Sequence, residues 1–77
     1  MEYDQEKVDQ AVLGLLFLNL FEDAPVTRAW KSLPWEVMDR LHQKGFIADP
    51  KSKAMSVVMT EEGKQAVEAA FSELFGQ

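Results

Sequence analysis

The segment from Met38 to Gly63, MDRLHQKGFIADPKSKAMSVVMTEEG, constrains the fold more than any other part of the chain. Gly45 follows a helix-periodic stretch and predicts a left-handed helix stop, because glycine adopts positive φ without strain. The β-rich runs GFIA and SVVM, separated by the turn-forming DPKSKA, predict a hairpin. Thr60 predicts the N-cap of a final helix, and two glutamates follow it in the first turn.

The first helix is predicted to begin after Asp4, a favoured N-cap residue, and to end in the acidic segment before Pro25. Within it, residues 11–21 are apolar on nearly every side of the helix axis. A helix of this kind must be covered all round, and a domain of 77 residues has little mass to do so. We therefore expect a homodimer joined by the terminal helices, with the Phe71–Phe75 end of the last helix in the seam.

Two more helices are predicted between the first helix and the hairpin. Thr27 is expected to cap a short helix over residues 28–31, and Ser32 and Pro34 to restart the chain as a longer helix. The predicted order is helix, short helix, helix, β-hairpin wing, helix. This order is a small α+β winged helix-turn-helix, and we expect residues 1–77 to form a single domain of this type.

Composition and charge limit the class of protein. The chain contains no cysteine, so it forms no disulfide and no thiolate zinc site. Its longest apolar stretch is too short to span a membrane, and its first ten residues are acidic, unlike a secretory signal. We expect a soluble, cytoplasmic protein. The net charge is −5, yet residues 28–53 carry six cations against three anions, whereas the rest carries two cations and ten anions.

The segment LHQKGFIADPKSKAMSVVMTEEG resembles the recognition helix, wing and following helix of small winged-helix regulators. Their pattern is Leu-x-x-Lys-Gly-Leu/Ile-Ile, a polar wing and Leu/Met-Thr-x-x-Gly. The matching residues are Leu41, Lys44, Gly45, Phe46, Ile47, Met59, Thr60 and Gly63. The resemblance covers about a third of the chain and implies a fold, since winged-helix domains bind DNA, RNA or protein.

Nearly the whole chain is similar to an uncharacterised family of small, mainly bacterial proteins. Its motifs are an Asp-x-x-Lys-Val/Ile-Asp-x-Ala-Val-Leu opening, Arg-Ala-Trp-Lys, Leu-Asp-Arg-Leu-His-x-Lys-Gly, Asp-Pro-x-x-Lys-Ala-x-Ser-Val and Thr-Glu-Glu-Gly. They match here as DQEKVDQAVL from Asp4, RAWK from Arg28, MDRLHQKG from Met38, DPKSKAMSV from Asp49 and TEEG from Thr60. The chain departs from the family pattern in two places. Met38 stands where Leu is usual, and the acidic segment FEDAP precedes the Arg-Ala-Trp-Lys motif. The resemblance implies no activity.

Catalytic constellations are missing from the sequence. His42 is the only histidine, no cysteine is present for it to activate, and no glycine-rich phosphate loop occurs. The position of His42 in the last turn of a predicted helix is explained by the helix dipole. One histidine with scattered carboxylates is also a poor set of metal ligands. We expect neither an enzyme nor a cofactor or metal.

The basic middle of the chain favours a nucleic-acid-binding, transcription-regulator-like module that contacts duplex DNA. In a helix-turn-helix the second helix enters the major groove, where Arg pairs with guanine and Gln with adenine. The predicted contact residues are Arg28, Lys31, Arg40, Gln43, Lys44, Lys51 and Lys53. Two acids on the same helix, Glu36 and Asp39, oppose this interpretation because they would face a polyanion.

The alternative is a protein–protein interaction or adaptor domain that does not bind DNA. Trp30 and Trp35 bracket a predicted helix junction, where tryptophan serves either as an interface anchor or as core. Their positions favour the core. The adaptor hypothesis predicts an exposed apolar patch beyond the dimer seam, whereas the nucleic-acid hypothesis predicts that the seven contact residues share one surface.

Overall fold

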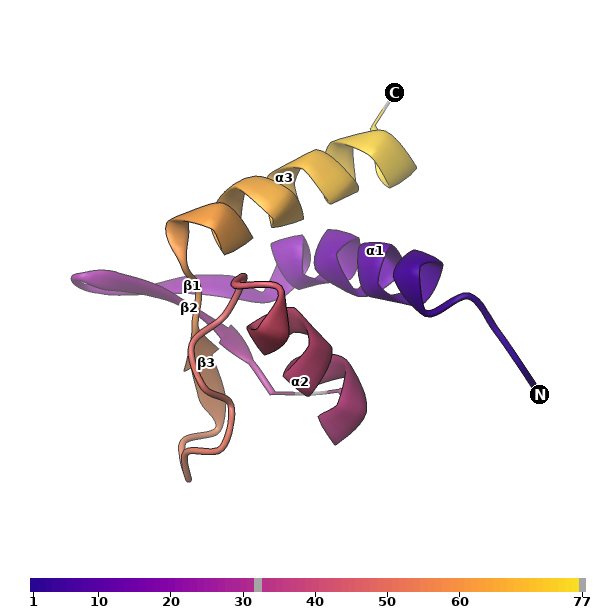
Figure 1. Ribbon diagram of the computed structural model, residues 1–77. Helices are drawn as coiled ribbons and strands as arrows, with labels where there is room; N and C mark the ends of the chain where they lie inside the picture. The colour runs from indigo at the N-terminus through magenta and orange to yellow at the C-terminus, as the bar shows by residue number, and fades with distance from the viewer. Residues whose placement is uncertain (32, 77) are drawn as a thin grey trace.

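The computed structural model describes residues 1–31 and 33–76 (Figure 1). Three helices and a three-stranded antiparallel sheet alternate along the chain, with a short 3-10 turn after the first helix. The elements are α1 (Gln5–Leu16), η1 (Phe17–Asn19), β1 (Leu20–Asp23), β2 (Val26–Trp30), α2 (Trp35–Gln43), β3 (Ser56–Val58) and α3 (Glu61–Phe75).

Three locally encoded helix ends are confirmed. The Asp4 carboxylate accepts a hydrogen bond from the backbone N–H of Lys7 (3.1 Å) and caps α1. Gly45 has a φ of 81° and ends α2, while the N–H of Phe46 donates to the carbonyl of Leu41. The Thr60 hydroxyl accepts from the N–H of Gly63 (2.9 Å) at the start of α3.

The winged helix-turn-helix is wrong, although the α+β class is right. Residues 28–30 of the predicted short helix over residues 28–31 instead form the end of β2, which pairs with β1 on one side and β3 on the other. The first helix also ends early, at Leu16, because the chain turns into β1 before the predicted break. Pro25 therefore lies in the tight turn of a β1–β2 hairpin, and the predicted role of Ser32 lies outside the described residues.

Thr27 caps no helix. It is a buried strand residue whose hydroxyl donates a 2.8 Å hydrogen bond to the Glu22 carboxylate on the neighbouring strand. The predicted wing is only partly present, since Ile47 and Met59 form an isolated antiparallel bridge. The run after the loop contributes β3, whose main partner is β2. A strand predicted to complete a separate wing is thus the third strand of the central sheet.

The core lies between the helices and one face of the sheet. Residues alternate between two faces along a strand, and Ala29 and Val57, which lie directly opposite each other, point inward. They pack with buried residues of all three helices, among them Leu16, Leu41 and Val67. Figure 1 shows α1 lying between α3 and α2, with the sheet crossing one end of this arrangement. Within residues 1–31 and 33–76, no helix lies on the opposite face of the sheet.

Candidate functional site

Two of the predicted contact residues, Arg40 and Lys44, bind carboxylates of α1. Arg40 donates from Nε and Nη2 to the Asp9 carboxylate at 2.8–3.0 Å. Lys44 donates to Asp9 (3.0 Å) and to Glu6 (2.9 Å). The Asp9 side chain is only 1 % exposed, so these charges form a partly buried link between α1 and α2. We call Glu6, Asp9, Arg40 and Lys44 the α1–α2 ion cluster.

The ion cluster follows from helix spacing. Glu6 and Asp9 are three residues apart on α1, and Arg40 and Lys44 are four apart at the end of α2, so each pair shares a face. The hydrogen bonds from Arg40, followed by those from Lys44, hold the pKa of Asp9 below its ordinary value. The carboxylate therefore remains ionised at neutral pH. This spacing was a signal in the sequence that the charge count by itself did not reveal.

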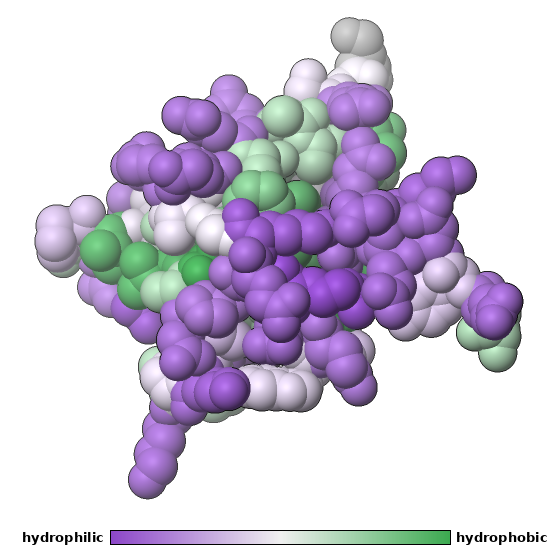
Figure 2. All heavy atoms as spheres, in the orientation of Figure 1, coloured by the Kyte–Doolittle hydropathy of each residue, from purple (hydrophilic) through white to green (hydrophobic). Residues whose placement is uncertain are grey.

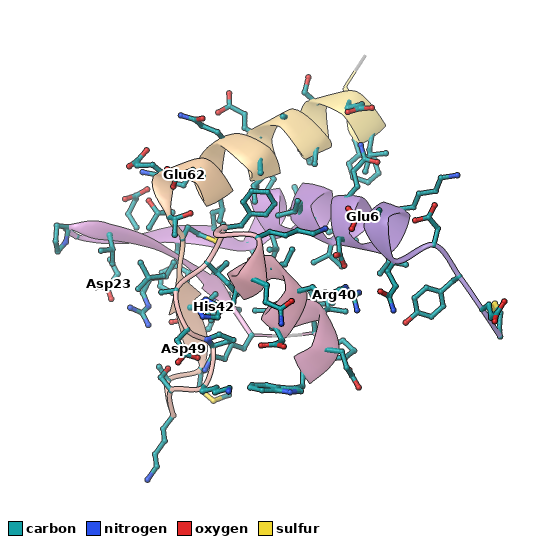
Figure 3. All side chains as sticks on the ribbon, viewed as in Figure 1. Glu6, Asp23, Arg40, His42, Asp49 and Glu62 are labelled. Atoms are coloured by element: carbon teal, nitrogen blue, oxygen red, sulfur yellow. The ribbon has the colours of Figure 1, made fainter. Side chains whose placement is uncertain are left out.

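The remaining predicted contact residues lie elsewhere. Figure 3 shows Arg40 on the side of α2 toward α1 and Glu6, whereas Asp49, which precedes two of the lysines, lies on the other side. Gln43 donates to Asp39 within α2 (3.1 Å). Lys31 donates to the carbonyl of Ser52 (2.8 Å), Lys51 lies 5.8 Å from the centre of the Trp35 ring, and Lys53 is exposed. The structure thus gathers Lys31 and Lys51 near one loop but separates them from Arg40 and Lys44.

The sheet face without helices carries an apolar surface, which we call the outer sheet face: Phe21, Val26, Arg28, Trp30 and Val58. Register places these residues on one side, because Phe21 and Val58 both lie opposite Arg28. The rings of Phe21 and Trp30 stack with centroids 4.6 Å apart. None of the four apolar members belongs to the core cluster or packs against it.

Both tryptophans were predicted to be core, and that prediction is wrong. Trp30 is 50 % exposed and Trp35 is 52 % exposed. Trp30 follows Ala29, which is fully buried, so strand alternation turns it outward. Beside it, Arg28 donates to the hydroxyl (2.7 Å) and carbonyl (3.2 Å) of Ser56, and these bonds orient its guanidinium on the outer sheet face. The alternation of Val26, Arg28 and Trp30 was the sequence signal for this surface.

A second apolar surface covers the ends of the terminal helices, and we call it the terminal-helix patch: Leu15, Phe17, Leu18 and Phe75. All four are substantially exposed, Leu18 most of all at 69 %. Phe17 and Phe75 are held close together because both rings contact Phe71, and a side chain at Gly14 would also lie 3.2 Å from the Phe75 ring. On the face seen in Figure 2, hydrophobic side chains gather over the β1–β2 hairpin and beside α3, while hydrophilic ones cover α2.

Residues 4–77 match the family described as Domain of unknown function (DUF6429). The chain belongs to this family. A relative, the "Uncharacterized protein y4hR" of Sinorhizobium fredii (strain NBRC 101917 / NGR234), is 45 % identical over 75 residues, which are 97 % of each chain. No solved structure matches. The similarity of the whole chain to a small bacterial family is thus supported, and the winged-helix part of the resemblance is not.

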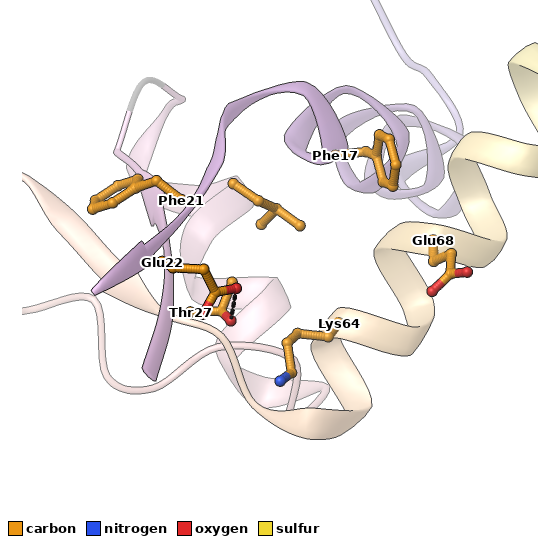
Figure 4. A pocket seen from close by; sticks show the side chains of 7 residues that line it. Phe17, Phe21, Glu22, Thr27, Lys64 and Glu68 are labelled. Atoms are coloured by element: carbon orange, nitrogen blue, oxygen red, sulfur yellow. Dashed lines mark hydrogen bonds between the residues drawn. The ribbon is translucent and has the colours of Figure 1, made fainter. Parts of the chain in front are cut away.

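A pocket of about 300 Å³ opens between β1 and α3 of this DUF6429 chain (Figure 4). Phe17, Leu20 and Phe21 form its apolar wall, and the polar side chains around it come from Glu22, Thr27, Lys64 and Glu68. Figure 4 shows the Thr27–Glu22 hydrogen bond at the strand side of the pocket and Lys64 reaching toward it from α3.

In the described ranges, 1–31 and 33–76, no three His, Cys, Asp or Glu side chains are grouped as metal ligands. His42 lies with Nδ1 3.1 Å from the carbonyl oxygen of Ile47, a contact that ties the end of α2 to the following loop. Within the same ranges, no helix is long and apolar enough to cross a membrane.

Proposed function

We propose that this DUF6429 domain is a protein-interaction domain that docks on a partner protein through its outer sheet face. The observation that carries the proposal is the stacked Phe21–Trp30 pair, in which Trp30 is 50 % exposed, on a sheet face that no described helix covers. Tryptophan and arginine are the residues most often found as energetic anchors of protein interfaces. Here Arg28 lies on the same face, with its guanidinium already oriented by Ser56.

The proposed domain is a homodimer, with the terminal-helix patch as the seam. Leu15, Phe17, Leu18 and Phe75 are exposed and carry no charge, so two copies can bring the same patch together without like-charge repulsion. The outer sheet face would then be the apolar patch that the adaptor hypothesis predicts outside the dimer seam. This arrangement leaves one docking face on each copy.

The nucleic-acid alternative has less support. Arg40 and Lys44 are bonded to α1 carboxylates, so presenting them to DNA would leave the buried Asp9 without its partners. Lys51, which lies over the Trp35 ring, and the exposed Lys53 remain available, but the chain as a whole carries a net charge of −5. A domain that binds nucleic acid through its phosphates is usually basic.

Site-specific photo-crosslinking tests the proposed function. A benzophenone side chain replacing Val26 on the outer sheet face should crosslink to one discrete partner protein in the native host. The same replacement at Glu73, an exposed position on α3, should not. Trp30→Glu should abolish the adduct while leaving the circular dichroism spectrum unchanged. Adducts with nucleic acid, or a protein adduct that is unaffected by Trp30→Glu, would refute the proposal.

A further inference from the structure

We propose that an extended peptide segment binds beside β1 as a fourth strand of the sheet, with an apolar side chain in the pocket between β1 and α3. We call this pocket and the adjoining edge of β1 the β1–α3 groove. Peptide binding in this groove goes beyond the function proposed above. The groove's strand residues Leu20, Glu22 and Thr27 alternate with those of the outer sheet face, whereas Phe21 lines the pocket as well. Val26, Arg28 and Trp30 do not line the pocket, so they report on the outer sheet face alone.

β1 is the free edge of the sheet. The strand order is β1-β2-β3, and no other described residue pairs with the outer side of β1. The opposite edge is partly occupied, because Ile47 bridges to Met59 and the N–H of Ala48 donates to the carbonyl of Val58 (2.9 Å). Alternate residues of an edge strand direct N–H and C=O groups away from the sheet, and these groups can pair with an incoming strand.

The pocket provides the side-chain site that backbone pairing needs for selectivity. Its volume of about 300 Å³ lies at the lower limit for small-molecule pockets and suits one or two side chains. Its walls are held in place before any ligand arrives. Phe17 stacks on Phe71 with centroids 4.4 Å apart, Thr27 is bonded to Glu22, and Lys64 is paired with Glu61 at 2.8 Å.

Charge around the groove selects the occupant. Glu22 and Glu68 line the groove and are exposed, and the exposed Asp23 ends β1, whereas the groove's cation Lys64 is already paired. A second copy of β1 would bring two more acids alongside these, and a nucleic acid would bring phosphates. The chemistry therefore favours an extended peptide in which Lys or Arg lies close to an apolar residue.

Selection from a library of random 12-residue peptides, followed by NMR titration of the domain with a synthetic enriched peptide, tests this inference. The enriched sequences should contain an apolar residue near Lys or Arg. The amide signals of Leu20–Asp23 and of the first turns of α3 should shift. Glu68→Lys should weaken binding about fivefold, the scale of an exposed charge reversal, while the matched Glu73→Lys leaves it unchanged.

Backbone-methylated peptides test strand addition itself. Methylating the amide nitrogens that face β1 should weaken binding about tenfold through lost hydrogen bonds, and methylating the alternate nitrogens should not. The inference would be overturned if both sets of methylated peptides lost the same affinity, or if the selection enriched no sequence. It would also be overturned if the β1 amide signals shifted when the peptide-free domain was concentrated. Shifts confined to Val26, Arg28 and Trp30 would overturn it too, but would leave the proposed docking face intact. If the Val26 crosslink failed while the peptide still bound beside β1, the proposed docking face would be refuted and the β1–α3 groove would stand.

Discussion

The residue that most changes the interpretation of this chain is Asp9. Its side chain is buried, yet it accepts bonds from both Arg40 and Lys44, and these cations lie more than 30 residues away in the chain. An ionised carboxylate is tolerated in such a place only with paired, hydrogen-bonded partners. The cations at the end of α2 therefore serve to join two helices, and this role accounts for them without a nucleic acid.

Replacing Asp9 with Asn should destabilise the domain. The substitution leaves Arg40 and Lys44 without their shared anion, and because both cations are partly solvated we expect a loss of about 2 kcal/mol in the free energy of unfolding. Urea denaturation measures this loss. As a control, Glu6→Gln removes a partner of Lys44 that is 79 % exposed, and should cost less than about 1 kcal/mol. Equal losses for the two variants would contradict the assigned role of Asp9.

The pH dependence of stability should carry the signature of the same carboxylate. The Arg40 guanidinium lowers the pKa of Asp9 in the folded state below its ordinary value of 3.8. The stabilisation is therefore complete above about pH 3.8 and is lost as the pH falls through the lower, folded-state pKa. Thermal melts from pH 7 to pH 2 should show wild type losing its advantage over Asp9→Asn only below pH 3.8. A loss near neutral pH would contradict this assignment.

At the scale of elements, the junction between α2 and α3 depends on a close backbone contact. The Thr60 hydroxyl donates to the carbonyl of Gly45 (2.6 Å), and the N–H of Thr60 donates to the carbonyl of Phe46 (3.1 Å). These bonds hold the first turn of α3 against the residues that follow α2. Gly63 lies at this contact, and a Cβ there would overlap the backbone carbonyl oxygen of Phe46.

Gly63→Ala should therefore destabilise the domain by about 2–3 kcal/mol, because a backbone carbonyl cannot move aside as a side chain can. Gly14→Ala is the matched control within another helix. Its Cβ would meet the flexible Phe75 ring at 3.2 Å, and the gain in helix propensity offsets this, so the change should stay within about 1 kcal/mol. Thermal unfolding followed by circular dichroism compares the two. A similar melting temperature for both variants would contradict the proposed close contact.

At the scale of the whole molecule, the domain leaves two apolar surfaces outside its core. The outer sheet face lies on the far side of the sheet from the helices, and the terminal-helix patch lies at the ends of α1 and α3. A small domain has a large surface relative to its volume, so its three helices can cover one sheet face but not both. The exposed residues of both surfaces are available for association.

Self-association should depend on the terminal-helix patch. Light scattering should give wild type a mass twice the 8.7 kDa of one chain, and Leu18→Glu should give the mass of a monomer, because it buries a charge in an apolar seam. Ala69→Glu, at an exposed position elsewhere on α3, and Trp30→Glu should both remain dimers. A monomeric wild type at millimolar concentration would rule out the terminal-helix dimer.

The predictions that held concern groups that interact within a few residues of one another. The Asp4 cap, the Gly45 stop and the Thr60 cap each depend on bonds that span three to five residues, so side-chain chemistry and backbone freedom decide them locally. The lack of a catalytic constellation remains an expectation that the structure does not test.

Tertiary structure decided what depends on distant partners. Val26, Arg28 and Trp30 alternate over too few residues to distinguish strand from helix, and residues 28–30 become strand because Phe21 and Val58 lie on either side of Arg28. Tertiary structure also decided the roles of the basic residues. The charge count grouped all the cations of residues 28–53, but the α1–α2 ion cluster separates Arg40 and Lys44 from the others. Local chemistry determined where helices begin and end. Only the folded chain determined which residues became strand and which cations remained free, because pairing energy comes from partners that the sequence alone does not bring together.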